Sequence, residues 1–589
     1  MLLGTTVTAV QSRFISRPNG LLIPAGAAAM PLDLASVYLS GSEVFGVAPT
    51  PALIADELGR MPFSFVLSFV AATLTEHRDP GVPVGRADRE FADRWLGGSA
   101  LVRARNLLRD PARRLVVPQA MYVLIKLAAL HSPDAVLPGV AAPRLALPYF
   151  GALEVIAAEH HELDHRDLVV DTEVGELASA LVANQHLNQP LDEDHLMARF
   201  VRQWLDLPAE RSTDKRVVDL EQAFVEVTGV PLQDVVVVAV ALWARSAIGQ
   251  PYLPPDYVTV RGWGNDRLAA ALGLLTADLT TLRGLLRQEA GEEESSPAWT
   301  FSTLERYPVV RFDDGALLVL DRNLLVRRIF GGLTLYDITA PLENGDRGAR
   351  RRANRVRGCV RHLAEVYALE LLEAATTSTS TAPRVFGDAE LQAALARPGR
   401  RLADAAVDYG DAWVVAEVTT SKLKRASVAA SPVALSEDLN KLVDEAEQIH
   451  STITALRTEE PALTGAPAPA RRFYPLLVVA EGFPVNPVST ELLRQRVHQR
   501  GLLTGTDVAP LEVVDTVELG MLQALAEQGG PSMREVFAGK EHAAFHRSSV
   551  RDYVLRECGY KPGRSARTSE LLDRAFGLAM DALRPADVA

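Results

Sequence analysis

The chain contains very little cysteine, with only Cys359 and Cys558 among its 589 residues. A small secreted domain held by disulfides needs several cysteine pairs, and a structural zinc site needs Cys and His at close spacing, so the sequence excludes both classes. Two isolated cysteines fit a reducing compartment. We therefore expect a cytoplasmic protein.

Long apolar runs are also missing. The longest purely apolar run covers residues 235–244, about half of the ~20 residues that a membrane-spanning helix needs, and it fits a buried helix instead. The N-terminal stretch has Arg13 and Arg17 but lacks the order of basic, apolar and small residues that marks a signal peptide. These absences predict a chain that has no membrane partner.

Motifs of several known chemistries are absent as well. There is no glycine-rich phosphate loop before a helix, which argues against ATP-driven movement along a substrate, and no G-x-S-x-G turn of a serine hydrolase. The net charge of −13 argues against binding nucleic acid through overall charge. Any nucleic-acid contact must therefore come from a local patch.

What the sequence does have is the composition of an ordinary globular protein, with 48% hydrophobic and 23% charged residues in a chain long enough for several domains. We predict that residues 1–290 form a mainly helical region for regulation or for binding a protein partner. Helical spacing or continuous apolar faces mark residues 63–75, 119–130, 175–188, 217–227, 232–248 and 266–288.

A polar linker follows, and then a small β-containing bridge at residues 298–340. Two short strands at 307–312 and 316–321 enclose an Asp-Asp-Gly turn, and residues 324–335 fit either a strand or a helix. Residues 346–589 alternate between helix and strand signals and predict an α/β domain with extra helices. The predicted fold class is a multidomain α and α/β protein.

One histidine-rich stretch, at residues 159–165, was a candidate for metal binding. His161 and His165 are four residues apart and would share one helix face, as ligand pairs do. No second group of ligands follows at a recognisable spacing, and the stretch is polar on all sides. We interpret it as a solvated helix end.

The most informative stretch is residues 402–422. Strand-forming residues flank Gly410 and Asp411, a pair that suits the two-residue turn of a hairpin, and this turn sets a register with Asp404 opposite Glu417. Carboxylates that face each other repel unless a cation lies between them. Mg²⁺ commonly uses one or two carboxylates together with phosphate oxygens, so the pair predicts a metal site for phosphodiester chemistry. Taken alone, it also fits an exposed hairpin with solvated acids.

A basic stretch precedes the helix predicted at residues 358–375. Residues 345–425 hold 14 Lys and Arg against 10 Asp and Glu, a local net charge of +4 in an acidic chain. Such local positive charge is where phosphate contacts are expected, although a solvated helix face has the same composition. The arginines of this stretch are Arg347, Arg350, Arg351, Arg352, Arg355, Arg357 and Arg361.

From residue 358 the predicted order is helix, three strands, helix and strand, with Asp404 and Glu417 on the hairpin. This order resembles the αβββαβ core of the PD-(D/E)xK, or restriction-endonuclease-like, nuclease superfamily over roughly residues 346–530. The resemblance assigns the motif's first carboxylate to Asp404 and the ExK carboxylate to Glu417, and it adds Glu365 on the first helix. It implies that these three residues bind Mg²⁺ or Mn²⁺.

The sequence departs from the family pattern at the lysine of the ExK motif, where Thr419 stands. A threonine hydroxyl cannot replace an ammonium group that orients the attacking water or neutralises charge on the phosphate. Lys422, just past the strand, is the provisional replacement, and Lys441 and Gln448 on the following helix are alternatives. Without a replacement the site would be inactive.

With this resemblance, the favoured function is a metal-dependent nuclease acting on nucleic acid, preferably DNA. Bacterial restriction and anti-phage defence use similar fusions, which is an analogy only, and the sequence leaves a homo-oligomer open. Two alternatives remain: a catalytically degenerate nuclease fold that binds nucleic acid or acts as a scaffold, and a helical interaction protein with a structural C-terminal domain. The residues expected along the phosphate backbone are Arg350, Arg351, Arg352, Arg355 and Arg357.

Overall fold

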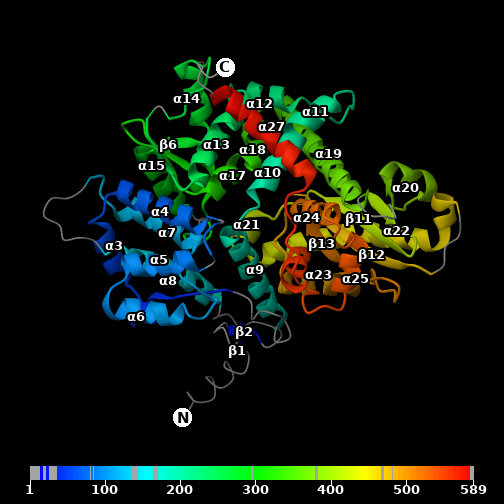
Figure 1. Ribbon diagram of the computed structural model, residues 1–589, viewed down its shortest axis with the longest axis horizontal. Coiled ribbons are helices and arrows are strands. Elements are labelled where there is room, and N and C mark those ends of the chain that lie inside the picture. Colours follow the sequence, from blue (N-terminus) through cyan, green and yellow to red (C-terminus); the bar gives the residue numbers. More distant parts are fainter. Residues whose placement is uncertain are drawn as a thin grey trace, which may run out of the picture.

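The computed structural model describes residues 14–16, 22–24 and 36–583, apart from residues 80, 84, 136–143, 164–169, 256, 293–295, 378–382, 466–469 and 481. Most of this part of the chain is helical, with small mixed sheets, in agreement with the predicted α and α/β class. Figure 1 shows the N-terminal helices, in blue, on one side of the molecule and the largest sheet, with its yellow and orange helices, on the other.

The first part of the chain is a packed set of helices. The ranges predicted at 63–75, 119–130, 175–188, 217–227 and 232–248 are confirmed, with their ends shifted by a few residues. Within the described ranges no single helix is both long and apolar enough to cross a membrane, and two bent pairs, α3 with α4 and α12 with α13, reach that composition only together. The helices are α2 (Gly41–Phe45), α3 (Pro51–Leu58), α4 (Phe63–His77), α5 (Arg86–Trp95), α6 (Gly98–Leu107), α7 (Pro118–His131), α8 (Ala146–Leu163), α9 (Val170–Asn188), α10 (Glu193–Phe200), α11 (Leu207–Glu210), α12 (Leu220–Thr228) and α13 (Leu232–Ala247), with a π-helical turn η2 at Val201–Asp206. Two short strand pairs accompany them, β1 (Phe14–Ser16) with β2 (Leu22–Pro24) and β3 (Val37–Tyr38) with β4 (Arg113–Arg114).

The range 266–288, predicted as one helix, is instead a helix, a strand and a second helix. α14 (Asn265–Gly273) ends before β6 (Thr276–Asp278), and α15 (Leu279–Ala290) begins directly after it. The carboxylate of Asp278 accepts a hydrogen bond at 2.7 Å from a backbone N–H in the first turn of α15, and so it caps the new helix. Helical spacing continues across the break because the strand is so short, and the pattern alone therefore hides it.

β6 joins the bridge hairpin in a four-stranded sheet of order β5-β8-β7-β6. The predicted hairpin is present as β7 (Val309–Arg311) and β8 (Leu317–Val319), which pair antiparallel. β5 (Tyr252–Leu253) pairs with β8 and β6 with β7, so strands from the helical region complete this sheet. Residues 324–335 belong to two helices separated by Gly331 and Gly332, so the helical alternative is the one that forms. The bridge helices are α16 (Ser302–Arg306), α17 (Arg322–Phe330) and α18 (Leu333–Glu343).

The C-terminal part is built on a five-stranded sheet of order β13-β12-β11-β10-β9. β9, β10 and β11 pair antiparallel, whereas β11, β12 and β13 are parallel. β9 to β12 are the four strands of the predicted order and β13 follows them, but the helix α20 (Asp388–Leu395), between β9 and β10, was not predicted. The strands are β9 (Arg384–Gly387), β10 (Ala405–Asp408), β11 (Ala412–Thr419), β12 (Arg472–Val479) and β13 (Glu512–Asp515).

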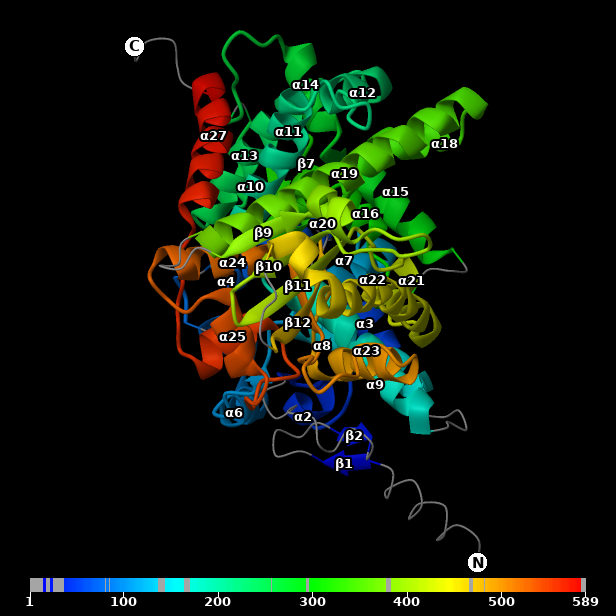
Figure 2. The same cartoon turned by 90° about the vertical axis from the view of Figure 1, so that its right-hand side faces the viewer.

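Helices cover both faces of this sheet (Figure 2). β11 is buried along its whole length because Val414 and its alternate neighbours pack under α19 and α24, while Trp413 and its alternate neighbours pack under α20, α22 and α23. The basic stretch is the first part of α19. The helices are α19 (Arg347–Thr377), α21 (Arg425–Val428), α22 (Pro432–Thr464), α23 (Pro487–Gln499) and α24 (Thr516–Glu527).

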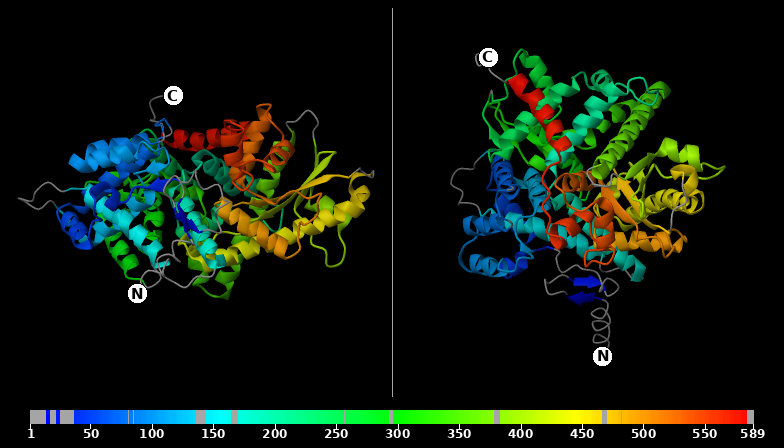
Figure 3. Two further views of the ribbon diagram at one scale, coloured as in Figure 1. Left: turned by 90° about the horizontal axis from the view of Figure 1, so that it is seen from below. Right: turned by 45° about the vertical axis from the view of Figure 1, so that its right-hand side comes forward.

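The last helix, α27 (Ala566–Leu583), returns to the first half of the chain and packs against α10 and α13 (Figures 1 and 3). The ring of Phe576 stacks on Trp243 of α13 with 5.6 Å between centroids. Arg574 donates two hydrogen bonds to Asp206. The end of the described chain therefore completes the packing of the earlier helices. Before it come α25 (Met533–Lys540), α26 (Val550–Asp552) and the π-helical turn η3 (Tyr553–Glu557).

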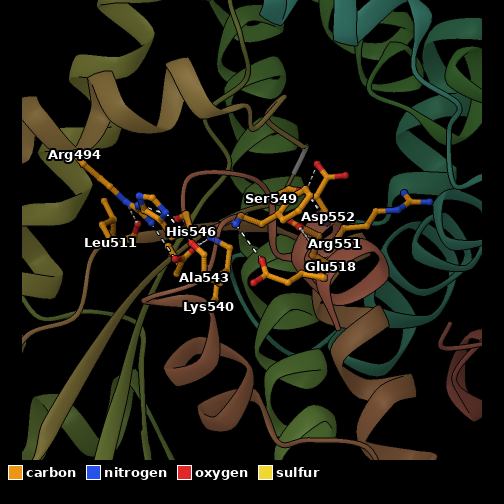
Figure 4. Close-up of polar contacts among 12 residues, drawn as sticks. Arg494, Leu511, Glu518, Lys540, Ala543, His546, Ser549, Arg551 and Asp552 are labelled. Atoms are coloured by element: carbon orange, nitrogen blue, oxygen red, sulfur yellow. Dashed lines mark hydrogen bonds and ion pairs between the residues drawn. The ribbon is translucent and has the colours of Figure 1, made fainter. Parts of the chain in front are cut away.

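A buried ion cluster holds the edge strand β13 in place (Figure 4). The fully buried Lys540 Nζ donates to Glu512 Oε2 at 2.8 Å and to the backbone carbonyl of His546 at 3.0 Å. Arg494 donates to Glu512 Oε1 at 2.9 Å and to the same carbonyl at 3.0 Å. Burial lowers the pKa of Lys540, and the charge of Glu512 opposes this shift. The cluster thus fastens α23, β13, α25 and the loop after α25 to one another.

Candidate active site

The hairpin of β10 and β11 forms with the predicted turn and register. The backbone N–H of Tyr409 donates to the carbonyl of Ala412 at 3.0 Å, and Gly410 has a φ of +82°, which glycine adopts without steric cost. Continuing the strand pairing by one residue puts Asp404 opposite Glu417. The two carboxylates therefore lie on the same face of the hairpin, the one that packs under α22.

Both carboxyl groups lie where their charged forms are disfavoured. Glu417 is 5% exposed, and burial, followed by the charges of Asp404 and Glu445, raises its pKa to about 10. Burial also raises the pKa of Asp404 to about 6. The backbone N–H of Val418, which donates to Asp404 Oδ2 at 2.8 Å, opposes that rise, while the nearby charge of Asp388 adds to it. A cation between the two groups would favour their ionised forms.

Gln448 on α22 reaches the buried glutamate, as one of the sequence alternatives predicts. Its Nε2 donates to Glu417 Oε1 at 2.5 Å and to Glu445 Oε2 at 2.9 Å. Glu417 Oε2 is buried and has no hydrogen-bond partner within the described part of the chain, which costs free energy until it gains a ligand or a proton. Lys441, the other alternative on α22, donates to Asp438 Oδ1 at 3.1 Å.

Glu365 approaches this pair from α19. Burial raises its pKa to about 7, and the charge of Asp404 is the next contribution. His362, one turn earlier on α19, lies 3.8 Å from Glu365 Oε2 through Nδ1 and 3.2 Å from Asp214 Oδ2 through Nε2. The three carboxylates predicted from the sequence, Glu365, Asp404 and Glu417, thus interact electrostatically at the open end of the hairpin.

Thr419 stands where the resembled motif has lysine, and Lys422 is the predicted replacement. Both side chains have other contacts in the structure. The hydroxyl of Thr419 accepts a hydrogen bond from the backbone N–H of Ser421 at 3.1 Å and so stabilises the loop after β11. The Lys422 ammonium lies 6.0 Å from the ring centroid of Tyr336 on α18, a cation–π distance. The geometry around Thr419 therefore does not itself supply a cation to Glu417.

Sequence reasoning missed three charged residues around the site: Asp388, Arg401 and Glu445. Asp388 is in the first turn of the unpredicted helix α20. Glu445 lies three residues before Gln448, and this spacing on a predicted helix was a usable signal. Arg401, three residues before Asp404, lies 3.9 Å from Glu445, and nothing in the local pattern connects these two positions.

Oxygen ligands dominate the site, which suits a hard divalent cation. Among the residues that the structure describes, no three Asp, Glu, His or Cys side chains stand close enough together to hold a metal ion. Mg²⁺ nevertheless commonly takes one or two carboxylates and fills its remaining positions with water and substrate phosphate. Asp404 and Glu417 fit that requirement, and Glu417 Oε2, which has no hydrogen-bond partner among the residues that the structure describes, is available to a metal ion. Of the histidine pair, His161 is near the end of α8 and His165 lies outside the described residues.

The predicted phosphate-binding arginines all lie on α19, N-terminal to Glu365. Arg357 and Arg350 precede it by 8 and 15 positions, or ~12 and ~22 Å along the helix. Arg352 lies 3.8 Å from Glu226 at the surface, and Arg357 pairs with an exposed glutamate. The remaining three, which are exposed, are Arg350, Arg351 and Arg355. One helix thus carries both Glu365 and, about two to four turns before it, the five arginines.

The structure therefore brings together Glu365, Asp404 and Glu417, three of the four predicted catalytic residues. Gln448, Glu445 and Arg401 are connected to the same site, whereas Lys422 lies beside Tyr336. Likeness to known proteins adds nothing to this description. Comparison with models of protein families, with curated proteins and with solved structures gives no match to this chain.

Proposed function

We propose that this chain is a metal-dependent nuclease that hydrolyses phosphodiester bonds in nucleic acid, with DNA as the preferred substrate, through a site of the PD-(D/E)xK type. The observation that carries the proposal is the grouping of three carboxyl groups, the buried Glu417 and the partly buried Asp404 and Glu365, whose pKa values are all raised. Clusters of carboxyl groups with raised pKa values destabilise the folded state, and they occur chiefly at functional sites. The order of helices and strands from α19 to β12 also agrees with an αβββαβ core, although α20 is an addition.

In this proposal Asp404 and Glu417 hold one or two Mg²⁺ or Mn²⁺ ions, and Glu365 contributes through water. A bound ion of this kind lowers the pKa of a bound water and stabilises charge on the phosphate. The chain itself orients the carboxylates, because the N–H of Val418 holds Asp404 and the amide of Gln448 holds Glu417. Both contacts come from regular elements, β11 and α22, which position a site more accurately than loops do.

The arginines of α19 supply contacts to the backbone of the substrate. Contacts of this kind position a strand without reading its sequence, so any target preference must come from elsewhere. The N-terminal helical region is suited to that task or to binding a protein partner, because α9 lies against the domain: Asn486, the N-cap of α23, donates to Gln185 at 3.0 Å. Bacterial restriction or anti-phage defence is the setting that the resemblance suggests.

A second candidate function is supported by Thr419. With its hydroxyl engaged by the following loop and Lys422 beside Tyr336, a nuclease fold that has lost catalysis would have this arrangement. Such a protein would bind nucleic acid through the arginines or act as a scaffold. It would show salt-sensitive binding, because phosphate contacts release counterions, and no metal-dependent products.

The two functions are separated by incubating the purified protein with Mg²⁺ or Mn²⁺ and a panel of single- and double-stranded DNA and RNA. We expect cleavage by the wild type and a loss of at least ~100-fold in Asp404→Ala and Glu417→Ala. Glu437→Ala is the matched control, since Glu437 is an exposed glutamate on the same helix as Gln448 and should leave cleavage unchanged. Undiminished cleavage by a folded Glu417→Ala protein would remove Glu417 from the site, and binding without products would favour the degenerate fold.

A further inference from the structure

Three arginines lie close together in the segment before Asp404, and their contacts differ. Arg397 Nη2 is 2.7 Å and Arg400 Nη2 is 2.8 Å from the carboxylate of Glu459, so both form ion pairs with this one glutamate. Arg401 instead points to the acidic site, with its Nη2 3.9 Å from Glu445 Oε2. One arginine of the three is thus directed toward the carboxylates, and the other two serve a surface ion pair.

A continuous set of polar contacts joins Arg401 to the buried glutamate. Glu445 Oε2, which faces Arg401, accepts a hydrogen bond from Gln448 Nε2 at 2.9 Å, and the same nitrogen donates to Glu417 Oε1 at 2.5 Å. Burial raises the pKa of Glu417, and the positive charge of Arg401 is among the effects that oppose this rise. The guanidinium is therefore close enough to act electrostatically on the proposed metal-binding pair.

Exposure differs sharply along this set of contacts. The Arg401 side chain is 62% exposed, the Glu445 side chain 27%, and Glu417 as a whole 5%. A substrate arriving from solvent would meet the guanidinium before the carboxylates. An ion pair at 3.9 Å on an exposed side chain is weak, so Arg401 is free to exchange Glu445 for a phosphate. Its planar fork matches two phosphate oxygens, which a lysine cannot do.

Other cations near the site have different positions. Lys422 lies beside Tyr336 on α18, and Lys441 donates to Asp438. Arg361 and Arg216 influence Glu365 on the α19 side. Glu417, the ExK carboxylate, lies under α22, and the positive charge of Arg401 acts on it. Arg401 thus brings a positive charge to the side of Glu417, the acid whose expected lysine partner is replaced by Thr419.

We propose that Arg401 binds the scissile phosphate and takes the place of the missing ExK lysine. The proposal rests on the nuclease function argued above and deepens it. In hydrolysis the oxygen of a water bonds to phosphorus and one P–O ester bond breaks, while the water loses a proton and the leaving oxygen gains one. No oxidant or reductant is needed. Negative charge grows on the phosphate oxygens in this step, and a guanidinium bound to them stabilises the transition state more than the ground state.

The test compares Arg401→Ala, Arg401→Lys and Lys422→Ala with the control Arg397→Ala, which removes a similarly exposed arginine of the same segment. Steady-state cleavage of one oligonucleotide in Mg²⁺ gives kcat and KM for each. We expect Arg401→Ala to lower kcat roughly 100- to 1,000-fold with little change in KM. Arg401→Lys should recover part of the loss, because the charge remains, and Arg397→Ala and Lys422→Ala should stay near wild type.

A second measurement separates catalysis from folding and binding. Fluorescence anisotropy with the same oligonucleotide in Ca²⁺, together with thermal unfolding, should show less than about threefold weaker binding and an unchanged melting temperature for Arg401→Ala. Wild-type kcat in a folded Arg401→Ala protein, beside an inactive Glu417→Ala, would overturn the Arg401 proposal and leave the nuclease intact. A wild type that cleaves nothing would overturn both. A large loss in Lys422→Ala alone would return the role to Lys422.

Discussion

Replacing Glu417 by glutamine should make the metal-free protein more stable. The buried carboxyl has a pKa of about 10, against 4.5 for a free glutamate, so at pH 7 it is ionised in the unfolded chain and must take up a proton on folding. The free-energy cost of this protonation is about 1.4 kcal/mol for each pH unit above 4.5, or about 3 kcal/mol at pH 7. Glutamine is neutral at every pH and keeps an oxygen for Gln448, so it avoids this cost.

The stabilising effect of Glu417→Gln depends on pH, and its sign follows from the raised pKa of Glu417. A raised acid pKa means that the native state binds the extra proton, and stability therefore falls as pH rises from 4.5 toward 10. The advantage of Glu417→Gln should be about 1 kcal/mol at pH 5.5 and about 3 kcal/mol at pH 7. Below pH 4.5 both proteins carry a neutral side chain, and the difference should vanish.

Scanning calorimetry in EDTA at pH 5.5, 7 and 8.5 measures this effect as a melting temperature several degrees higher in the variant, with a gap that widens with pH. Mg²⁺ should raise the melting temperature of the wild type by mass action and leave Glu417→Gln unmoved. The exposed Glu437→Gln is the control and should change stability by less than about 0.5 kcal/mol. A variant that melts below the wild type in EDTA at pH 8.5 would refute the reasoning.

Two further substitutions test the packing. Lys540→Met should reduce the free energy of unfolding by about 3 kcal/mol, because Glu512 keeps Arg494 but loses its second buried partner; an unchanged urea midpoint would contradict this. Gly151→Ala should cost about 1–3 kcal/mol, since its Cβ would come within 2.3 Å of Ile54 Cδ1. The double variant with Ile54→Ala should be more stable than the two single losses added together, and strict additivity would argue against the contact.

Local patterns accounted for the strands of the five-stranded C-terminal sheet and for the register of Asp404 with Glu417. A two-residue turn with glycine first, followed by residues of strand type, leaves little freedom, so Asp404 could be placed opposite Glu417 from the sequence. Gln448 could be named as a candidate because the helix predicted after the hairpin has to pack against a face of that hairpin. Regular period and turn chemistry act over a few residues, and the elements of the hairpin are set within that range.

Contacts that depend on the tertiary arrangement could not be predicted in this way. Arg401 meets Glu445 across 44 positions of sequence, with a hairpin and a loop between them. The strand β6 pairs with β7, and this partner decides its conformation against a continuous helical pattern. Lys422, the provisional replacement for the lysine, lies within cation–π distance of Tyr336 on α18, just beyond the range 324–335 that the sequence left undecided between strand and helix.

The packing of α27 against α10 and α13 has a consequence for how the protein is made. About 320 residues separate Ala247, at the end of α13, from Ala566, at the start of α27. At roughly 5–20 residues per second, a ribosome needs about 15–60 s to cover that distance. During this time Trp243 lacks its partner Phe576, and the apolar side of α13 is open to chaperones or to other nascent chains. The first half of the protein therefore reaches its final packing only after synthesis of the last helix.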